Sequence, residues 1–180
     1  METVIAVVAV LLFLIVAALA VLWIMGRRRS DALRERFGPE YDRAVDSAGN
    51  RRGAEADLRD RQRRVDSLDI VELSPDEADA FGSEWRQVQA NFVDHPSEAV
   101  GEADRLVTRV MERRGYPVAD FDQRAADISV AYPEVVAEYR EARTVAVKNA
   151  DGGASTEELR QAMLHYRALF SELLGTAATA

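Results

Sequence analysis

The feature that most constrains this chain is an uninterrupted apolar run near its amino terminus. Residues 4–25 read VIAVVAVLLFLIVAALAVLWIM and contain no charged side chain. A helix rises about 1.5 Å per residue, so this run is about 33 Å long as a helix, against a hydrocarbon core of about 30 Å. Fifteen of its residues are Leu, Ile, Val or Phe, and each favours insertion by about 0.3–0.6 kcal/mol near the bilayer centre. The run predicts a transmembrane helix.

The charges at both ends of this run favour an anchor over a cleaved secretory signal. A signal would carry a basic start, a shorter apolar stretch and small residues at a cleavage site. Here Glu2 precedes the run, and Arg27, Arg28 and Arg29 follow it. Because cationic side chains collect on the cytoplasmic side of spans, we expect a single-pass protein of the cytoplasmic membrane, with its amino terminus outside and residues 26–180 inside. Release outside the cell, or the opposite orientation, is the alternative.

Charge is distributed unevenly along the rest of the chain. Residues 27–64 contain 12 Arg and 8 acidic residues, a net charge of +4, whereas residues 65–180 contain 11 Lys or Arg and 22 acidic residues, a net charge of −11. Each Arg near an anionic leaflet contributes about 1 kcal/mol, while the acidic part is repelled by lipid and nucleic acid phosphates. We therefore expect membrane lipid as a partner, with Arg27, Arg28 and Arg29 at the anionic leaflet, and no DNA or RNA.

Residues 26–73 are interpreted as a basic helical neck. Gly38-Pro39 interrupts any helix that continues from the membrane, because proline clashes with the preceding turn, and a second break is expected near Gly49-Asn50. Beyond it, four apolar residues keep a roughly heptad spacing: Ala54, Leu58, Val65 and Leu68. Arg61 interrupts this seam, so the sequence favours a charged helix lying along the distal domain or the membrane over a coiled coil.

Residues 74–174 carry the pattern of a bundle of about five short helices. Apolar residues recur at spacings of three and four, which places them on one face of each helix. These faces contain Ala78, Phe81, Trp85, Val88 and Phe92; Val100, Ala103, Val107, Val110 and Met111; Phe121, Ala125, Ile128 and Tyr132; Val135, Tyr139, Ala142 and Ala146; and Leu159, Ala162, Met163, Tyr166, Leu169, Phe170 and Leu173. Because short helices seldom hold alone in water, the faces imply mutual packing. We expect an all-α fold without strands, and a disordered tail at 175–180.

Two capping boxes mark helix starts in the bundle. Ser74 with Glu77, and Ser155 with Glu158, have the spacing at which a hydroxyl and a carboxylate each bind the backbone N–H of the other residue. A further helix is expected to begin at Pro133, since proline is favoured in the first turn.

The loop at residues 147–158, VKNADGGASTEE, has the length of a helix–loop–helix calcium site. It places Asn149, Asp151 and Glu158 where such a loop supplies oxygen ligands. However, its first coordinating position is a valine, and no second loop is present to pair with it. A helix stop at the two glycines followed by the Ser155 cap uses the same residues. We interpret the loop as a capped turn and assign it no metal.

The histidines and clustered carboxylates are interpreted as structural. His95 and His165 lie in different elements, and neither has a second ligand at the i+4 spacing that would let one helix face hold a metal. Glu134, Glu138 and Glu141 are interpreted as a solvated helix face, because no Glu-x-x-His motif accompanies them.

The aromatic residues of the first bundle helix leave one alternative open. Phe81, Trp85 and Phe92 are interpreted as core, but an aromatic groove for a partner helix uses the same residue types. The sequence assigns no catalytic, cofactor-binding or metal-ligating residue and no cofactor.

Four segments together resemble a known family. They are RFGPEYDRAV at 36–45, EADRLVTRVMERRGYPV at 102–118, DFDQRAADISV at 120–130 and STEELRQAMLHYRALFSELL at 155–174. They resemble a family of bacterial, mainly actinobacterial, membrane proteins with a single amino-terminal hydrophobic segment and a helical remainder. The resemblance covers most of residues 33–174. It implies one compact domain, and because no activity is assigned to that family, it implies no catalytic residues.

An anchor, a basic neck and an acidic domain together favour a membrane-tethered, non-enzymatic helical module for protein–protein interaction, which binds an unidentified protein or a second copy of itself. The alternative is a helical ligand-binding or enzymatic domain whose site is assembled from separate helices. That alternative predicts a polar, concave cluster with perturbed titratable groups.

Overall fold

The computed structural model describes the backbone of residues 1–175 and the side chains of residues 1, 14–21 and 23–175. In this part the chain is all-α, with eight helices and no strand, which confirms the expected fold class. The expected disordered tail at 175–180 lies outside the described residues apart from Gly175. The chain divides into two compact units, and the boundary between them in the sequence lies between Arg36 and Phe37.

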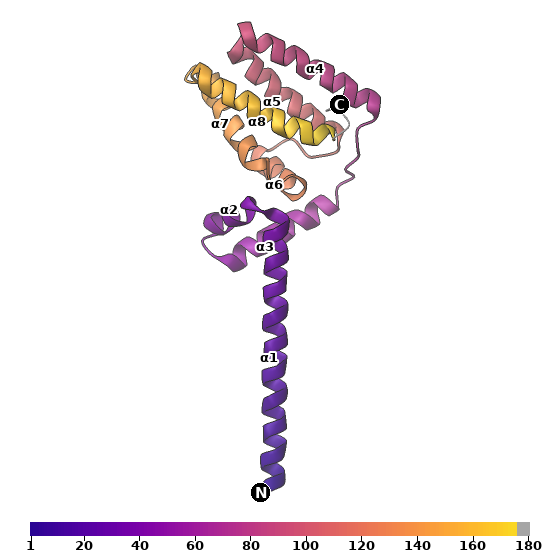
Figure 1. Ribbon diagram of the computed structural model, residues 1–180, viewed down its shortest axis with the longest axis vertical. Coiled ribbons are helices and arrows are strands. Elements are labelled where there is room, and N and C mark those ends of the chain that lie inside the picture. The colour runs from indigo at the N-terminus through magenta and orange to yellow at the C-terminus, as the bar shows by residue number, and fades with distance from the viewer. Residues whose placement is uncertain (176–180) are drawn as a thin grey trace. The chain divides into compact units, whose positions relative to one another are not determined.

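The first unit consists of helix α1 (Glu2–Phe37) up to Arg36 (Figure 1). The large apolar side chains described between residues 14 and 25 are exposed, from 45% for Ile24 to 64% for Trp23, whereas Leu33 further along the helix is buried. A search of the described residues finds no helix that combines the length and the apolar character needed to cross a membrane. Much of the expected span at 4–25 falls on residues 2–13 and 22, whose side chains are not among those described, so the span stays a prediction.

The second unit begins with a hairpin of two helices, α2 (Pro39–Ala48) and α3 (Arg51–Asp66). Both predicted breaks are confirmed: Gly38 has a φ of +46° and Gly49 a φ of +66°, backbone conformations that favour glycine. The Asn50 side chain then caps α3 by accepting a hydrogen bond from the N–H of Gly53 at 2.7 Å. The sequence places α2 and α3 in a neck separate from the bundle, whereas the structure groups them with it in one compact unit.

Five helices complete this unit: α4 (Pro75–Asp94), α5 (Pro96–Arg113), α6 (Phe121–Ala131), α7 (Val136–Ala150) and α8 (Thr156–Leu174). Both predicted capping boxes are present, at the starts of α4 and α8. The predicted start of α7 at Pro133 is wrong by three residues. Residues 133–135 instead form a turn, in which the N–H of Val135 donates to the carbonyl of Tyr132 at 3.3 Å.

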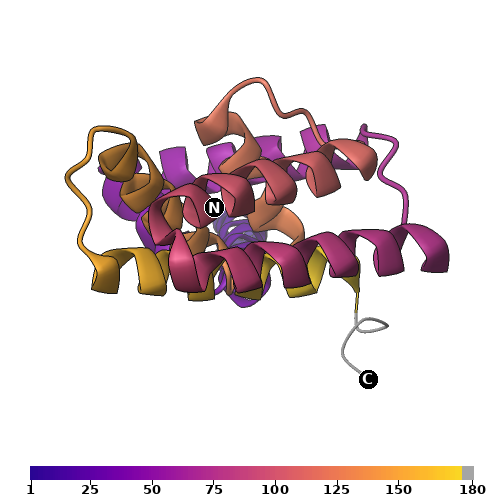
Figure 2. The same cartoon turned by 90° about the horizontal axis from the view of Figure 1, so that it is seen from above.

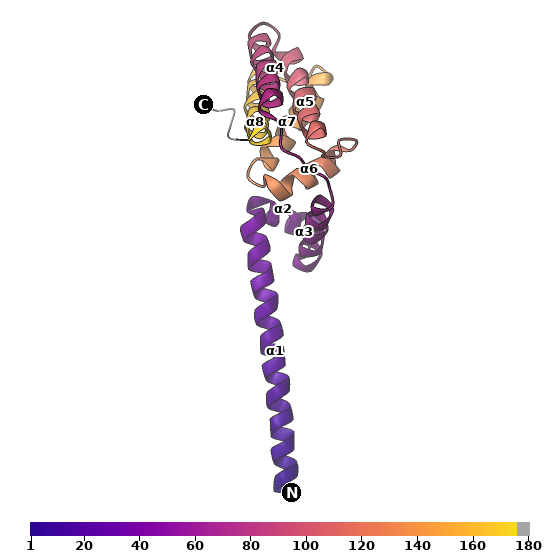
Figure 3. The same ribbon diagram turned by 90° about the vertical axis from the view of Figure 1, so that its right-hand side faces the viewer.

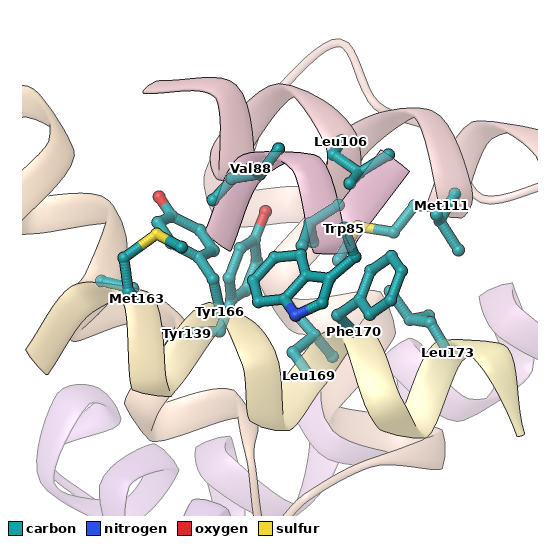
Figure 4. Close-up of a cluster of buried hydrophobic side chains, with 14 of the residues drawn as sticks. Trp85, Val88, Leu106, Met111, Tyr139, Met163, Tyr166, Leu169, Phe170 and Leu173 are labelled. Atoms are coloured by element: carbon teal, nitrogen blue, oxygen red, sulfur yellow. The ribbon is translucent and has the colours of Figure 1, made fainter. Parts of the chain in front are cut away.

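The apolar faces of α4–α8 meet in one core (Figure 4). The whole predicted faces of α5 and α8 are buried, whereas some members of the other faces, such as Phe81, Phe92 and Tyr132, are half-buried against the same core. Trp85 of α4 stacks on Phe170 of α8, with ring centroids 4.7 Å apart and an interplanar angle of 20°. The interpretation of Trp85 as a core residue is confirmed.

Helix α5 packs against α4, α7 and α8, and α6 packs against α7 and α3. Figure 2 shows α4 and α5 side by side, and Figure 3 shows α6 between the α2–α3 hairpin and the remaining helices. The apolar residues buried in the hairpin, among them Tyr41, Ala54 and Leu58, are not part of the main core. The buried apolar residues of the hairpin are therefore separate from the main core.

The segment between α3 and α4 binds the carboxyl end of α5. The N–H of Val71 donates to the carbonyl of Arg114 at 2.9 Å, and the Arg114 side chain donates to the carbonyl of Leu173 at 3.0 Å. Gly115 has a φ of +95°, and a Cβ there would lie 2.5 Å from the carbonyl oxygen of Asp69. Only glycine fits this crossing without displacing backbone.

Candidate functional site

The two histidines and the acidic residues at the start of and within α7 lie at or near the surface. His95 is exposed at the junction of α4 and α5, and Glu134, Glu138 and Glu141 are also exposed. His165 of α8 places its Nδ1 3.1 Å from the carbonyl oxygen of Glu138 and 3.6 Å from the carboxylate of Glu141. Among the described residues, no three acidic or histidine side chains are grouped as a metal site requires.

His165 also lines a groove of about 300 Å³ between α7 and α8. Its other charged residues are Glu141, Glu157 and Glu158. Two of these already bind cations, since Glu157 pairs with Arg160 and Glu158 pairs with Lys148. The groove is therefore acidic but has few carboxylate oxygens left for a ligand.

The residues of the loop at 147–158 bind other parts of the protein. Asn149 exchanges two hydrogen bonds with Ser97, at 2.7 and 2.8 Å. Glu158 accepts from the Ser155 N–H at 2.8 Å and from Lys148 Nζ at 2.5 Å. The Lys148 hydrogen bond, together with those from Ser155, lowers the pKa of Glu158 to about 2. The predicted cap is confirmed, and it uses oxygens that a calcium loop would need.

The least expected feature is a buried carboxylate between the hairpin and the bundle. Glu40 of α2 has only 1% of its side chain exposed and forms a two-pronged ion pair with Arg140 of α7, at 2.7 and 2.9 Å. Arg61 of α3 donates to the same carboxylate at 2.8 Å. Burial alone raises the pKa of Glu40, but the hydrogen bonds and charges of Arg140 and Arg61 outweigh it and hold the pKa below its usual value.

A second buried carboxylate lies beside α3, and together with Glu40, Arg61 and Arg140 it forms what we call the charged layer. Asp127 of α6 is fully buried and accepts from Arg64 Nε of α3 at 2.8 Å and from Gln123 Nε2 at 3.0 Å. Its other oxygen, Oδ2, and the Nε of Arg61 are buried without a hydrogen-bond partner. Ion pairs thus connect α2 to α7 and α3 to α6.

The core contains buried tyrosines whose ionisation is suppressed. The Tyr166 hydroxyl donates to Asp104 Oδ1 at 2.9 Å, and Arg143 donates to Oδ2 of the same carboxylate at 2.6 Å. Burial is the main cause that raises the pKa of Tyr166, and it raises the pKa values of Tyr139 and Tyr116 to about 12. These phenols stay protonated near neutral pH and act as packing groups; the hydroxyl of Tyr166 is hydrogen-bonded, whereas that of Tyr139 is buried without a partner among the described residues.

A second groove, of about 170 Å³, lies between α4 and α8 beside the stacked Trp85 and Phe170 (Figure 4). Among the residues that the structure describes, its charged lining residues are Arg86 and Arg167 alone. A third, of about 360 Å³, lies between α4 and α5, and its charged lining residues carry both signs. We define the first of these two as the α4–α8 groove.

Sequence reasoning missed both the Glu40 cluster and the two arginines of the α4–α8 groove. The one available signal for the cluster was Arg61, which occupies a position where the apolar seam of α3 requires a hydrophobic residue. The arginines gave no signal, because the sequence contains 22 arginines and does not indicate which of them lack a carboxylate partner.

The chain matches no family model, no curated protein and no solved structure. The resemblance to a family of single-pass actinobacterial membrane proteins therefore stays a prediction.

Proposed function

We propose that this chain is a single-pass membrane protein whose helical domain is a non-enzymatic module for binding another protein. In this proposal residues 4–25 span the bilayer, residues 26–73 form a basic neck, of which α2 and α3 pack onto the bundle, and residues 74–174 form the helical bundle. The observation that carries the anchor is the exposure of apolar side chains along α1: Leu14, Ile15, Val16, Leu19, Val21, Trp23, Ile24 and Met25 are each 45–64% exposed. A row of this kind in water would be an aggregation site, whereas lipid solvates it.

The carboxyl end of this row has the chemistry of a membrane interface. Trp23 is at the expected depth for an interfacial aromatic ring, and the Arg27 guanidinium lies 5.1 Å from its centroid. Arg27, Arg28 and Arg29 favour a cytoplasmic location for residues 26–180, in the cytoplasmic membrane of the cell.

The interior of the second unit supports a binding role over catalysis. A ligand-binding or enzymatic domain calls for a polar, concave cluster with perturbed titratable groups. The shifted groups described here are either ion-paired, as Glu40 is, or are buried core phenols, of which Tyr166 binds the Asp104 carboxylate. Tethering such a domain raises its effective concentration for partners at the same membrane.

The anchor is tested by fractionating cells that express the full chain or a form lacking residues 1–25. We expect the full chain in the membrane pellet after carbonate washing and the shortened chain in the supernatant. A reporter fused to the carboxyl terminus, active only in the cytoplasm, should be active. Recovery of the full chain in the carbonate supernatant would contradict the anchor, and an inactive reporter on a stable fusion would contradict the orientation.

The binding role is tested by photo-crosslinking in intact cells. A photoreactive amino acid is placed, one position at a time, at exposed sites on each helix of the second unit, with buried positions as controls. We expect reproducible crosslinks to one protein from neighbouring exposed sites, either a different protein or a second copy of this chain. A complete scan without any protein crosslink would contradict the interaction role.

A further inference from the structure

We propose that the α4–α8 groove is the binding site for an acidic peptide segment of a partner protein, an inference that rests on the proposed interaction role. The groove is lined from α4 by Gly82, Trp85, Arg86 and Gln89, and from α8 by Arg167, Phe170, Ser171 and Leu174. Gly82 contributes no side chain to this wall, which keeps the space beside Trp85 open.

The charge of this groove is opposite to that of its surroundings. Residues 65–180 carry a net charge of −11, yet no carboxylate of the described residues lines the groove. Arg86 and Arg167 are exposed and form no ion pair within the described part of the chain, whereas Arg109 and Arg143, for example, each bind a carboxylate. Two unpaired guanidinium groups in one groove of an acidic domain can bind carboxylates without first breaking an internal ion pair.

The polar groups of the groove are mainly hydrogen-bond donors. The indole N–H of Trp85 donates to no described protein atom and is not among the buried atoms that lack a partner, so it is open to an acceptor. The side chains of Gln89 and Ser171 also form no hydrogen bond within the described residues. An ionised carboxylate only accepts hydrogen bonds, and it therefore matches this set.

The stacked rings give the groove an apolar part. Trp85 and Phe170 are 6% and 4% exposed, so only a small part of each side chain faces the groove. A small apolar side chain next to the acidic residues can pack on this part. We therefore expect a short peptide that combines Asp or Glu with an adjacent apolar residue.

The charge of the whole domain favours a peptide over lipid or nucleic acid. A bilayer surface or a polynucleotide presents many phosphates, which the net charge of −11 repels at distances within the Debye length. A peptide with a few carboxylates meets little of this repulsion once it contacts the two arginines. The α7–α8 groove offers no equivalent site, since its charged residues besides His165 are all glutamates.

The test uses the full chain in nanodiscs of neutral phosphatidylcholine and defined fluorescent peptides. The peptides have one length and one Phe, with zero, two or four Glu, and a matched series carries Lys in place of Glu. We expect binding only in the Glu series, with affinity that rises with Glu number and falls at higher salt. The Arg86→Gln/Arg167→Gln double variant should lower the affinity about tenfold, as expected for two exposed ion pairs.

Arg105→Gln is the matched control, because Arg105 is also exposed, has no ion pair with any described residue and does not line this groove. It should leave the affinity within about twofold, well short of the roughly tenfold loss expected for the double variant. Absence of Glu-peptide binding, or equal losses in the control and the double variant, would overturn the proposal. Stronger arginine-dependent binding of phosphatidylglycerol vesicles or oligothymidine than of the Glu peptides would overturn the choice of a peptide.

The same peptides separate this inference from the proposed function. If crosslinking in cells detects a partner from other faces while no Glu peptide binds, the groove proposal fails and the interaction role stands. If no face of the domain crosslinks to any protein, the interaction role fails, and the groove proposal fails with it.

Discussion

Replacing Glu40 with Gln tests whether the buried ion pairs hold the hairpin to the bundle. The Glu40→Gln substitution keeps the shape of the side chain but removes the negative charge between Arg61 and Arg140, which are only 12% and 15% exposed. Removing one partner of a buried ion pair leaves uncompensated charge and typically costs about 3–5 kcal/mol. Because a domain's total stability is about 5–15 kcal/mol, this loss should be a large part of it.

The measurement is urea unfolding of the full chain in a neutral detergent. The sequence has two tryptophans, so a Trp23→Phe background leaves Trp85, in the main core, as the reporter. Glu141→Gln makes the same chemical change on a side chain that is 72% exposed, and it should alter the free energy of unfolding by less than about 0.5 kcal/mol.

The pH dependence gives the reasoning a second, independent check. Because the pKa of Glu40 is below its usual 4.5 in the folded protein, its contribution to stability is present above pH 4.5 and is lost as the pH falls through the folded-state pKa. The stability difference between the wild type and Glu40→Gln should therefore shrink in acid. A loss under about 1 kcal/mol at neutral pH, below the range for a broken buried pair, would refute the reasoning. So would a difference that does not change with pH.

Three further predictions concern local features. Gly115→Ala should destabilise the domain by more than the approximately 1–2 kcal/mol that a left-handed backbone alone costs, because the new Cβ would collide with the Asp69 carbonyl. Gly152→Ala is the control: Gly152 has a φ of +73° and open space around it, so thermal unfolding should show only the backbone cost. Ser155→Ala should cost about 1 kcal/mol through loss of the cap, and calcium should not change the melting temperature of either protein. The pKa of Tyr139 is raised from 10 to about 12, so its contribution to folding stability is fully present below pH 10 and should be lost as the pH rises from 10 to about 12. In a pH titration, the tyrosinate absorbance of Tyr139 should appear only near pH 12.

Local interactions made much of the fold predictable. The breaks at Gly38-Pro39 and Gly49-Asn50 depend on the backbone preferences of neighbouring residues, and the capping boxes involve residues three apart. The helix faces followed from a period of 3.6 residues, which the sequence displays directly. All of these features are determined within one or two helical turns.

The charged layer could not be predicted, because its contacts join residues that are distant in the chain. Glu40 and Arg140 are 100 positions apart, and Arg64 and Asp127 are 63 apart. A helix face predicts that a residue is buried but not which element covers it. The sequence accordingly indicated that Arg61 was out of place in an apolar seam, without indicating the carboxylate that it binds.

The same ion pairs reduce the number of neck arginines that are available to attract an anionic leaflet. A count over residues 27–64 finds 12 arginines, but Arg43, Arg51, Arg59, Arg61, Arg63 and Arg64 each pair with a carboxylate inside the second unit. A paired guanidinium adds little to the attraction of an anionic leaflet, since its partner repels the same phosphates. The three arginines that directly follow the apolar run contribute about 1 kcal/mol each when held at the surface. Lipid attraction should therefore come chiefly from Arg27, Arg28 and Arg29, while the charges of α3 act mainly in folding.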